Sequence, residues 1–348
     1  MGLRIHRVWH PAVNIVAVLL FLVGSIVSLS IAYSAGNRSV EAAIPPATCF
    51  DFSAGTIWEY YDNQNNDPEQ GACPKNVDIP STIGSETVAI IENEAFAGKQ
   101  LASLTIPNTV VTIADYAFAG NYLTSLAIPD SVTSIGIGIT GGNTGLSLSI
   151  GTTGFSGTPT LNIPEGAFGG AGLASLTLGN NVLSIGKTAF ASNSSLTTLT
   201  IPNSVTLIDD EAFTMCSGLT SLFISGSVVS IGNRAFQDAS ITSLTLSEGI
   251  RYIGDHAFDY ALDATSLHLP DSVESVGEGA FYNASNVTDL NIGSGLSHIP
   301  WQAFAYMSSL KTLYIPSTVT SFDGTAFQGD DLEDLVIGEL LSMNMTNM

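Results

Sequence analysis

The stretch Leu196–Phe213, with the sequence LTTLTIPNSVTLIDDEAF, decides the fold of this chain. Its first half follows a Leu-x-x-Leu-x-Ile pattern that ends in proline, and its second half holds a Val, an Ile and the dipeptide Ala-Phe. The order Leu199, Thr200, Ile201 is typical of a strand that buries every second side chain. The proline that follows ends the strand, because it has no N–H to donate to a neighbouring strand.

The same unit recurs through most of the chain. Ala-Phe dipeptides lie 22 or 23 residues apart with one gap of 50, and their phenylalanines are Phe96, Phe118, Phe168, Phe190, Phe213, Phe236, Phe258, Phe281, Phe304 and Phe327. Within the gap, Ile135 and Ile163 stand where other repeats have an aliphatic residue five positions before the phenylalanine. Thr140 therefore replaces one phenylalanine, and about five surplus residues fall in Gly151–Pro159. The sequence predicts eleven repeats, one degenerate and one with an insertion.

A single strand in each repeat cannot pair with itself. If the repeats stack in register, each strand can pair with the equivalent strand of the next repeat and all apolar positions share one interior. The predicted fold is a mainly β repeat solenoid of about eleven 22–23-residue repeats with a parallel sheet.

The unit L-x-x-L-x-I-P-x-S-V-x-x-I-G-x-x-A-F resembles the BspA-type leucine-rich repeat of bacterial surface proteins, over residues 77–338. This resemblance implies a right-handed, curved leucine-rich repeat solenoid at the cell surface, with a role in adhesion to host proteins or other cells. It supplies no catalytic residues. The chain lacks an LPxTG-type wall-sorting signal at its C-terminus, so we expect an N-terminal anchor rather than covalent attachment to a cell wall.

The N-terminus has the charged-then-apolar order of an export signal. Arg4, His6 and Arg7 precede the apolar run Ala12–Tyr33, which contains no charged residue. The run is long enough to span a bilayer, and small residues near its end would also permit cleavage. Both a cleaved signal peptide and a retained transmembrane anchor remain open, and in either case we expect an extracellular, cell-surface location.

Composition excludes several classes of protein. The formal net charge is −22, and residues 41–348 hold six of the nine basic residues and all 31 acidic ones, a net charge of −25. Such a charge repels nucleic acid, which we exclude as a partner. Only 11% of residues are charged, which is too few for a disordered acidic tail or a coiled coil.

The three cysteines have two predicted roles. In an oxidising exterior Cys49 and Cys73 are expected to pair, within an aromatic-rich segment that would cap the first repeat. Cys216 lies three residues after a repeat phenylalanine, where we expect a small buried side chain.

No motif in the sequence supports catalysis, a cofactor or a metal. The string Gly136–Gly141 matches G-x-G-x-x-G but is not followed by a helical pattern. The oxygen-rich segment Asp62–Asp67 lacks the glycine and the final carboxylate of a calcium loop. The histidines stand apart from other metal ligands, and no G-x-S-x-G is present. We expect a protein that is not an enzyme.

The outward strand positions indicate where a partner would bind. In the N-terminal half these positions form a plain Ser/Thr ladder, whereas the C-terminal half departs from it. Solenoids bind through extended faces, and exposed aromatic residues are common anchors. The predicted partner-binding residues are Phe223, His268, Asp289, Asn291 and Tyr314. The insertion is a second contact candidate, since insertions in repeats become surface loops.

These observations predict the organisation and function of the chain. The expected segments are a cytoplasmic N-terminus (1–11), a signal peptide or transmembrane anchor (12–34), a linker (35–48), a disulfide-bonded cap (49–76), the repeat domain (77–338, insertion 151–159) and a C-terminal tail (339–348). The predicted function is non-catalytic binding of an extracellular protein or cell surface, as an adhesin. The alternative is a structural surface protein that associates with itself through its C-terminal end. If the N-terminal segment is not cleaved, it would also contact the membrane.

Overall fold

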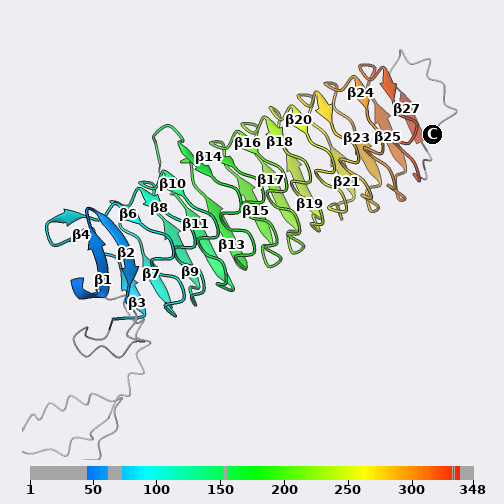
Figure 1. Ribbon diagram of the computed structural model, residues 1–348. Helices are drawn as coiled ribbons and strands as arrows, with labels where there is room; N and C mark the ends of the chain where they lie inside the picture. Colours follow the sequence, from blue (N-terminus) through cyan, green and yellow to red (C-terminus); the bar gives the residue numbers. More distant parts are fainter. Residues whose placement is uncertain (1–44, 62–72, 152–154, 331, 333, 338–348) are drawn as a thin grey trace, which may run out of the picture. The chain divides into compact units, whose positions relative to one another are not determined.

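The computed structural model describes residues 45–61, 73–151, 155–330, 332 and 334–337, and Figure 1 shows the repeats stacked as successive coils of a β solenoid. The predicted fold class is confirmed: the coils carry parallel strands, and the only helix in these ranges is the short 3-10 helix η1 (Ala47–Cys49). The predicted segments 1–11 and 12–34, most of the linker 35–48, the calcium-like segment 62–67 and the tail 339–348 lie outside the described residues. Within the described ranges, no helix has the length and apolar character needed to cross a bilayer.

One side of the solenoid, which we call the leucine face, is built largely from strands predicted from the Leu-x-x-Leu-x-Ile pattern. These strands are β3 (Asn76–Asp78), β7 (Ser103–Thr105), β9 (Ser125–Ile128), β11 (Leu146–Ile150), β13 (Leu173–Leu178), β15 (Thr198–Ile201), β17 (Ser221–Ile224), β19 (Ser243–Leu246), β21 (Ser266–His268), β23 (Asp289–Asn291), β25 (Thr312–Ile315) and β27 (Asp334–Ile337). Hydrogen bonding divides them into four parallel groups, β3-β7, β9-β11-β13, β15-β17-β19 and β21-β23-β25-β27. Within each group the inward Leu of one strand is opposite a Leu or Val of the next.

Strand β11 belongs to the repeat that carries the insertion, and it directly follows Thr140, which stands in place of the missing phenylalanine. Its Leu-x-Leu-x-Ile order differs from the usual Leu-x-x-Leu-x-Ile, so the pattern that identified the other strands passed over it. Strand β11 thus has one residue fewer than β13 between its first two leucines. A register shift between Leu146 and Ser147 restores the pairing with β13.

A second set of parallel strands, the isoleucine face, forms three hydrogen-bonded groups in the described residues and was not predicted from the sequence. Its strands are β2 (Thr56–Tyr60), β6 (Ile90–Ile91), β8 (Thr112–Ile113), β10 (Ser134–Ile135), β12 (Leu161–Ile163), β14 (Val182–Ile185), β16 (Leu207–Ile208), β18 (Ser230–Ile231), β20 (Tyr252–Ile253), β22 (Ser275–Val276), β24 (His298–Ile299) and β26 (Ser321–Phe322). Most contain only two residues, too few for alternation to be visible in the sequence. They pair from coil to coil through the aliphatic residue that precedes Ala-Phe by four positions. A separate hairpin joins β4 (Thr82–Ile83) to β5 (Glu86–Thr87).

The repeat phenylalanines form a column inside the solenoid, in two parts, Phe96–Phe118 and Phe168–Phe327. From Phe168 to Phe327 each ring stacks on the next, with centroids 5.2 to 5.8 Å apart. The side chains that line this column are fully or almost fully buried, so apolar burial is the main term that holds the coils together. Thr140 interrupts the column, is itself buried, and has a hydroxyl without a hydrogen-bond partner in the described part of the chain.

Buried asparagines connect some coils through hydrogen bonds. Three residues after the phenylalanine position, Asn121 accepts from the N–H of Leu101 at 3.0 Å and donates to the carbonyls of Phe96 and Phe118 at 2.8 and 2.9 Å. Asn143 and Asn193 make the equivalent bonds in their own coils. Without these side chains, the buried backbone carbonyl groups of the turns would have no hydrogen-bond donor.

Cys216 occupies the same position as these asparagines. Its side chain is fully buried, and its thiol lies 3.4 Å from the carbonyl oxygen of Phe190, so the predicted buried filler is confirmed. Burial raises the pKa of the thiol to about 11, which keeps it protonated and unreactive at neutral pH.

The N-terminal end of the solenoid is closed by a disulfide-bonded hairpin. Cys49 and Cys73 form a disulfide, and β1 (Phe50–Ser53) pairs in antiparallel fashion with β2. Strand β2 then pairs in parallel with β6, so the hairpin continues the isoleucine face. Tyr60 stacks on Phe96 at 5.2 Å and donates its hydroxyl to the carbonyl of Pro74 at 2.7 Å. Tyr60 thus extends the aromatic column by one position.

Candidate functional site

Four of the five predicted partner-binding residues lie together on the leucine face. The pairing of β21, β23 and β25 places His268 opposite Asn291 and Asn291 opposite Tyr314, so the three form one line across the strands. Asp289 lies in the neighbouring line, opposite Ser266 and Thr312. All four side chains are exposed. We call this group the C-terminal column.

The fifth residue, Phe223, does not belong to this column. It lies on β17 between Thr200 and Thr245 of the neighbouring strands. The sheet that contains β17 ends at β19, and a new hydrogen-bonded group begins at β21. At the end of the first group, Leu244 and Leu246 are only partly buried, unlike their equivalents in other coils. The five residues, predicted as one surface, therefore lie in two regions.

Phe223 instead borders a groove next to the insertion, which we call the insertion groove. The groove is shallow and open to solvent, with a volume of about 510 Å³. It follows the carboxyl ends of β13, β15 and β17, and its lining residues are Gly157, Pro159, Asn180, Thr200, Ile201, Pro202, Asn203, Ser204 and Phe223. Both candidates from the sequence, Phe223 and the insertion, meet here.

Asn181 fixes the two ends of the insertion. Its backbone carbonyl accepts hydrogen bonds from the N–H groups of Thr160 and Leu161 at 3.1 and 3.0 Å. Its side chain lies against Gly151, where a Cβ atom would be 2.0 Å from the amide oxygen, and Gly151 has a φ of +71°. Only glycine fits this position. The side chain of Asn181 is 1% exposed, and neither of its amide atoms has a hydrogen-bond partner in the structure as described.

A line of tyrosines was missed in the sequence. Tyr260, Tyr282 and Tyr306 lie in the turns that follow the repeat phenylalanines, and successive ring centroids are 5.7 and 5.1 Å apart. Tyr260 is 54% and Tyr306 37% exposed. The tyrosines lie one or two positions after repeat phenylalanines, so an alignment of these turn positions reveals the line, whereas the strand positions do not.

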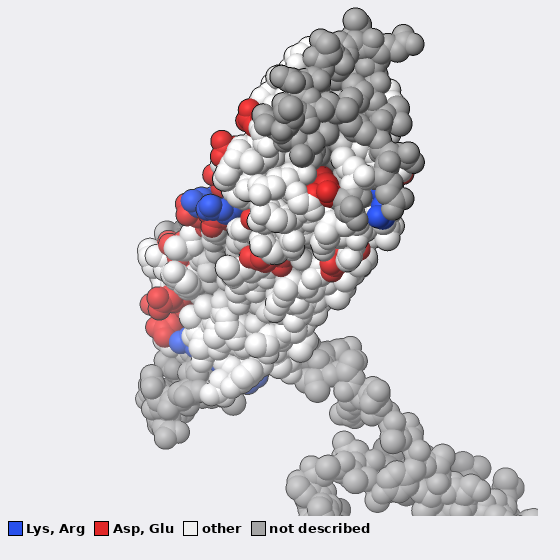
Figure 2. Space-filling model, turned by 90° about the vertical axis from the view of Figure 1, so that its right-hand side faces the viewer, with Lys and Arg blue, Asp and Glu red and all other residues white. Residues whose placement is uncertain are grey.

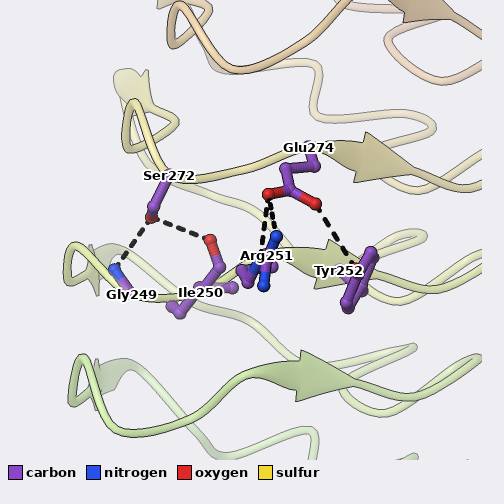
Figure 3. A network of polar contacts seen from close by, with 6 residues as sticks. All are labelled: Gly249, Ile250, Arg251, Tyr252, Ser272 and Glu274. Carbon is purple, nitrogen blue, oxygen red and sulfur yellow. Dashed lines mark hydrogen bonds and ion pairs between the residues drawn. The ribbon is translucent and has the colours of Figure 1, made fainter.

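Arg251 and Glu274, next to the isoleucine face, form an ion pair between neighbouring coils. The guanidinium of Arg251 bonds to a carboxylate oxygen of Glu274 in the next coil, and Tyr252 donates its hydroxyl to the other oxygen at 3.3 Å (Figure 3). Beside them, Ser272 accepts from the N–H of Gly249 and donates to the carbonyl of Ile250, both at 2.8 Å. On the face drawn in Figure 2, acidic groups are scattered among wide uncharged areas. Among the described residues, no group of three or more His, Cys, Asp or Glu could hold a metal ion.

The repeat pattern, the parallel faces and the phenylalanine column decide the family. The model for the BspA type leucine rich repeat region matches residues 72–146, 155–262 and 229–345. This chain belongs to the BspA type leucine-rich repeat family. Within this BspA-type repeat region, the first matched segment ends at residue 146, before the insertion, and the second begins at residue 155, within it.

Several solved structures resemble this BspA-type chain. A leucine-rich repeat protein from Bacteroides ovatus is 16% identical, with a TM-score of 0.48, over 79% of this chain and 72% of its own. A leucine rich cell surface protein from Faecalibacterium prausnitzii is 20% identical, with a TM-score of 0.28, over 84% of this chain and 93% of its own. The pneumococcal vaccine antigen PcpA is 19% identical, with a TM-score of 0.41, over 81% of this chain and 83% of its own. No curated protein sequence matches the chain.

Proposed function

We propose that this protein is an extracellular, non-catalytic adhesin that binds a protein or another cell through the C-terminal column. Proteins of the BspA-type family are usually found at bacterial cell surfaces, where their repeats serve protein interaction. The observation that carries the proposal is the alignment of His268, Asn291 and Tyr314 on adjacent strands, at positions where most of the preceding strands carry Ser or Thr.

The C-terminal column suits protein recognition for physical reasons. Adjacent parallel strands lie about 4.8 Å apart, so its three side chains cover about 10 Å on a rigid support. Tyr314 is 44% exposed and offers a large ring with few rotatable bonds, which loses little conformational entropy on binding. The net charge of −22 also favours encounter with a basic partner surface.

The proposal is tested by comparing two exposed tyrosines on opposite faces. Full-length protein in mild detergent is captured on a surface, and its binding to extracellular-matrix proteins and to whole cells is measured. We expect Tyr314→Ser to weaken binding at least about tenfold, since exposed aromatic residues are frequent binding hot spots. The matched control is Tyr252→Ser on the isoleucine face, because Tyr252 is 43% exposed. Equal effects of the two variants, or no effect of Tyr314→Ser, would contradict the proposal.

Self-association is a second candidate, which the C-terminal end of the leucine face favours. In the described part of the chain β27 pairs with β25 on one side only, and an unpaired strand edge can accept another strand. Sedimentation of the purified protein over a hundredfold range of concentration separates the two functions. An adhesin stays monomeric until a partner is added. The average mass of a self-associating protein increases with its own concentration.

The export route is part of the same proposal. Ala12–Tyr33 would direct the chain out of the cytoplasm and would then be removed or kept as an anchor. The mass of the protein isolated from its own cells distinguishes the two, because cleavage removes more than 30 residues from the N-terminus. A full-length mass in the cytoplasmic fraction would contradict export.

A further inference from the structure

The insertion groove is uncharged in a strongly acidic protein. The chain carries 31 acidic and nine basic residues, yet none of the nine residues that line the groove is charged. A charged ligand would therefore lose hydration on binding and gain no opposite charge in the groove, which costs free energy. The lining favours a neutral ligand.

The groove combines one aromatic ring with several free hydrogen-bonding groups. The ring of Phe223 is 42% exposed at its border. Asn180, Thr200 and Asn203 are exposed, and in the described structure their side chains form no hydrogen bond with the protein. Each amide can donate and accept, and so can the threonine hydroxyl. A purely apolar ligand would bury these groups without partners, so the ligand must itself carry many hydroxyl or amide groups.

The walls of the groove are held in place before any ligand arrives. Pro159 and Pro202 have restricted backbones, and Ser204 donates its hydroxyl to the carbonyl of Gly179 at 3.4 Å. Asn181, next to Asn180, holds both ends of the insertion against the solenoid. A preformed site loses less entropy on binding.

We propose that the insertion groove binds neutral sugar units of a glycan. A sugar ring has an apolar C–H face that can stack on Phe223, whose ring face is electron-rich. Its hydroxyls can then bond to Asn180, Thr200 and Asn203. These side chains are uncharged, as sugar hydroxyls are, and they can both donate hydrogen bonds to hydroxyls and accept from them. The same groups would recognise hydroxyls in any neutral hexose, so the class of ligand is defined by chemistry rather than by one sugar.

This binding site is separate from the C-terminal column. Phe223 lies on β17, and the column begins on β21 in a different hydrogen-bonded group of strands. The glycan proposal therefore does not rest on protein adhesion, and either can fail alone. Together they would give the protein two binding sites on the same face of the solenoid.

The test uses a printed array of neutral and acidic glycans probed with the full-length protein in mild detergent. We expect neutral glycans to be retained and acidic ones not, and the affinity for the strongest neutral glycan is then measured by calorimetry. Phe223→Ala should weaken this affinity at least about tenfold, and Phe223→Trp should preserve it, because tryptophan keeps an aromatic face. Asn203→Ala should weaken it through the lost hydrogen bonds.

Matched controls separate a local effect from unfolding or from the other site. Tyr314→Ala removes a ring of similar exposure outside the groove and should leave glycan affinity unchanged. All variants should keep the melting temperature of the parent protein, since the substituted side chains are exposed. The proposal is overturned if no neutral glycan is retained, if only acidic glycans are, or if Phe223→Ala and Tyr314→Ala bind alike. Binding of a neutral peptide instead of glycans, with dependence on Phe223, would overturn it in favour of a protein ligand.

Discussion

The two ends of the solenoid cover the apolar interior with different groups. At the N-terminal end, Tyr60 covers the outer face of Phe96, and a disulfide closes the hairpin around it. At the C-terminal end, Phe327 stacks on Phe304 at 5.8 Å and meets Phe322 edge-on at 6.0 Å, and it is 5% exposed. A repeat array needs closure at both ends. Within the described residues, the N-terminal end has a covalent closure in addition to its stacked ring, whereas the C-terminal end is described only by ring contacts.

The last described coil also differs from other coils at one buried polar position. Asp330 stands in the position of the buried asparagines, three residues after Phe327. One of its oxygens accepts from the N–H of Met307 at 2.8 Å, and the other is buried without a partner in the described structure. Burial raises the pKa of this carboxyl to about 8. A charged carboxylate cannot donate a hydrogen bond as the amide of Asn193 does.

Removing a ring at each end should have the largest effect. Phe96→Ala is expected to cost about 3–5 kcal/mol of unfolding free energy, because it leaves a cavity between two well-packed neighbours. Phe327→Ala should cost less, about 3 kcal/mol or below, since in the described residues its ring has one stacked neighbour, Phe304, and one edge-on neighbour, Phe322. Urea unfolding measures both, with Phe213→Ala as the interior reference. Equal costs for Phe96→Ala and Phe327→Ala would remove the difference between the ends.

Opening the disulfide should weaken the N-terminal end alone. The bond joins residues 24 positions apart, and a loop of this length contributes about 3 kcal/mol in the chain-entropy model. We expect the Cys49→Ala/Cys73→Ala variant to lose about that much, with hydrogen exchange increasing first near η1 and β1. Reducing agent should destabilise the parent protein and have no further effect on the variant. Faster exchange at the C-terminal coils instead would show that the cap acts on the whole array.

Asp330→Asn should stabilise the C-terminal end by a smaller amount. Because the folded carboxyl has a raised pKa, it holds a proton that the unfolded chain releases between about pH 4 and 8. Its contribution to the free energy of unfolding therefore falls as the pH rises through this range. At pH 8 the free energy of unfolding of the variant should exceed that of the parent by about 1–3 kcal/mol, because the buried carboxyl of the parent loses its proton in this range. At pH 5 that carboxyl is protonated, and the difference should be small.

Urea unfolding at pH 5, 6.5 and 8 measures this effect, with the exposed Asp263→Asn as the control. A gain that is the same at all three pH values would show that Asp330 does not titrate with folding. A loss of stability would show that the amide does not fit the position that Asn121, Asn143 and Asn193 occupy in their own coils.

Sequence periodicity predicted the interior of the solenoid well. Positions such as Leu199, Ile208 and Phe213 are buried in the structure because a spacing of 22 or 23 residues returns each side chain to the same point of a coil. The isoleucine face was not foreseen, since strands of two residues show no alternation. The aromatic segment that contains Tyr60 was predicted as a cap, but the stacking of this ring on Phe96 was not, because Tyr60 lies outside the repeat.

The candidate site was predicted only in part, for a different reason. Aligning repeats shows which residues share a column, and it placed His268, Asn291 and Tyr314 in one. It does not show where hydrogen bonding between coils stops, which is decided by contacts distant in sequence. The break between β19 and β21 and the path of the insertion separated Phe223 from the rest. The tyrosines of the turns were overlooked because turn positions were not aligned at all.

The regular stacking of the phenylalanine column makes the protein a molecular ruler. Each coil adds a ring about 5 Å beyond the last, as the stacked pairs from Phe168 onward show. A coil contacts only its neighbours, so one can be duplicated or lost without disturbing the packing of distant coils. The separation between the insertion groove and the C-terminal column is thus a whole number of coils. A lineage could change the reach between two binding sites by copying a single short segment, while keeping the chemistry of both.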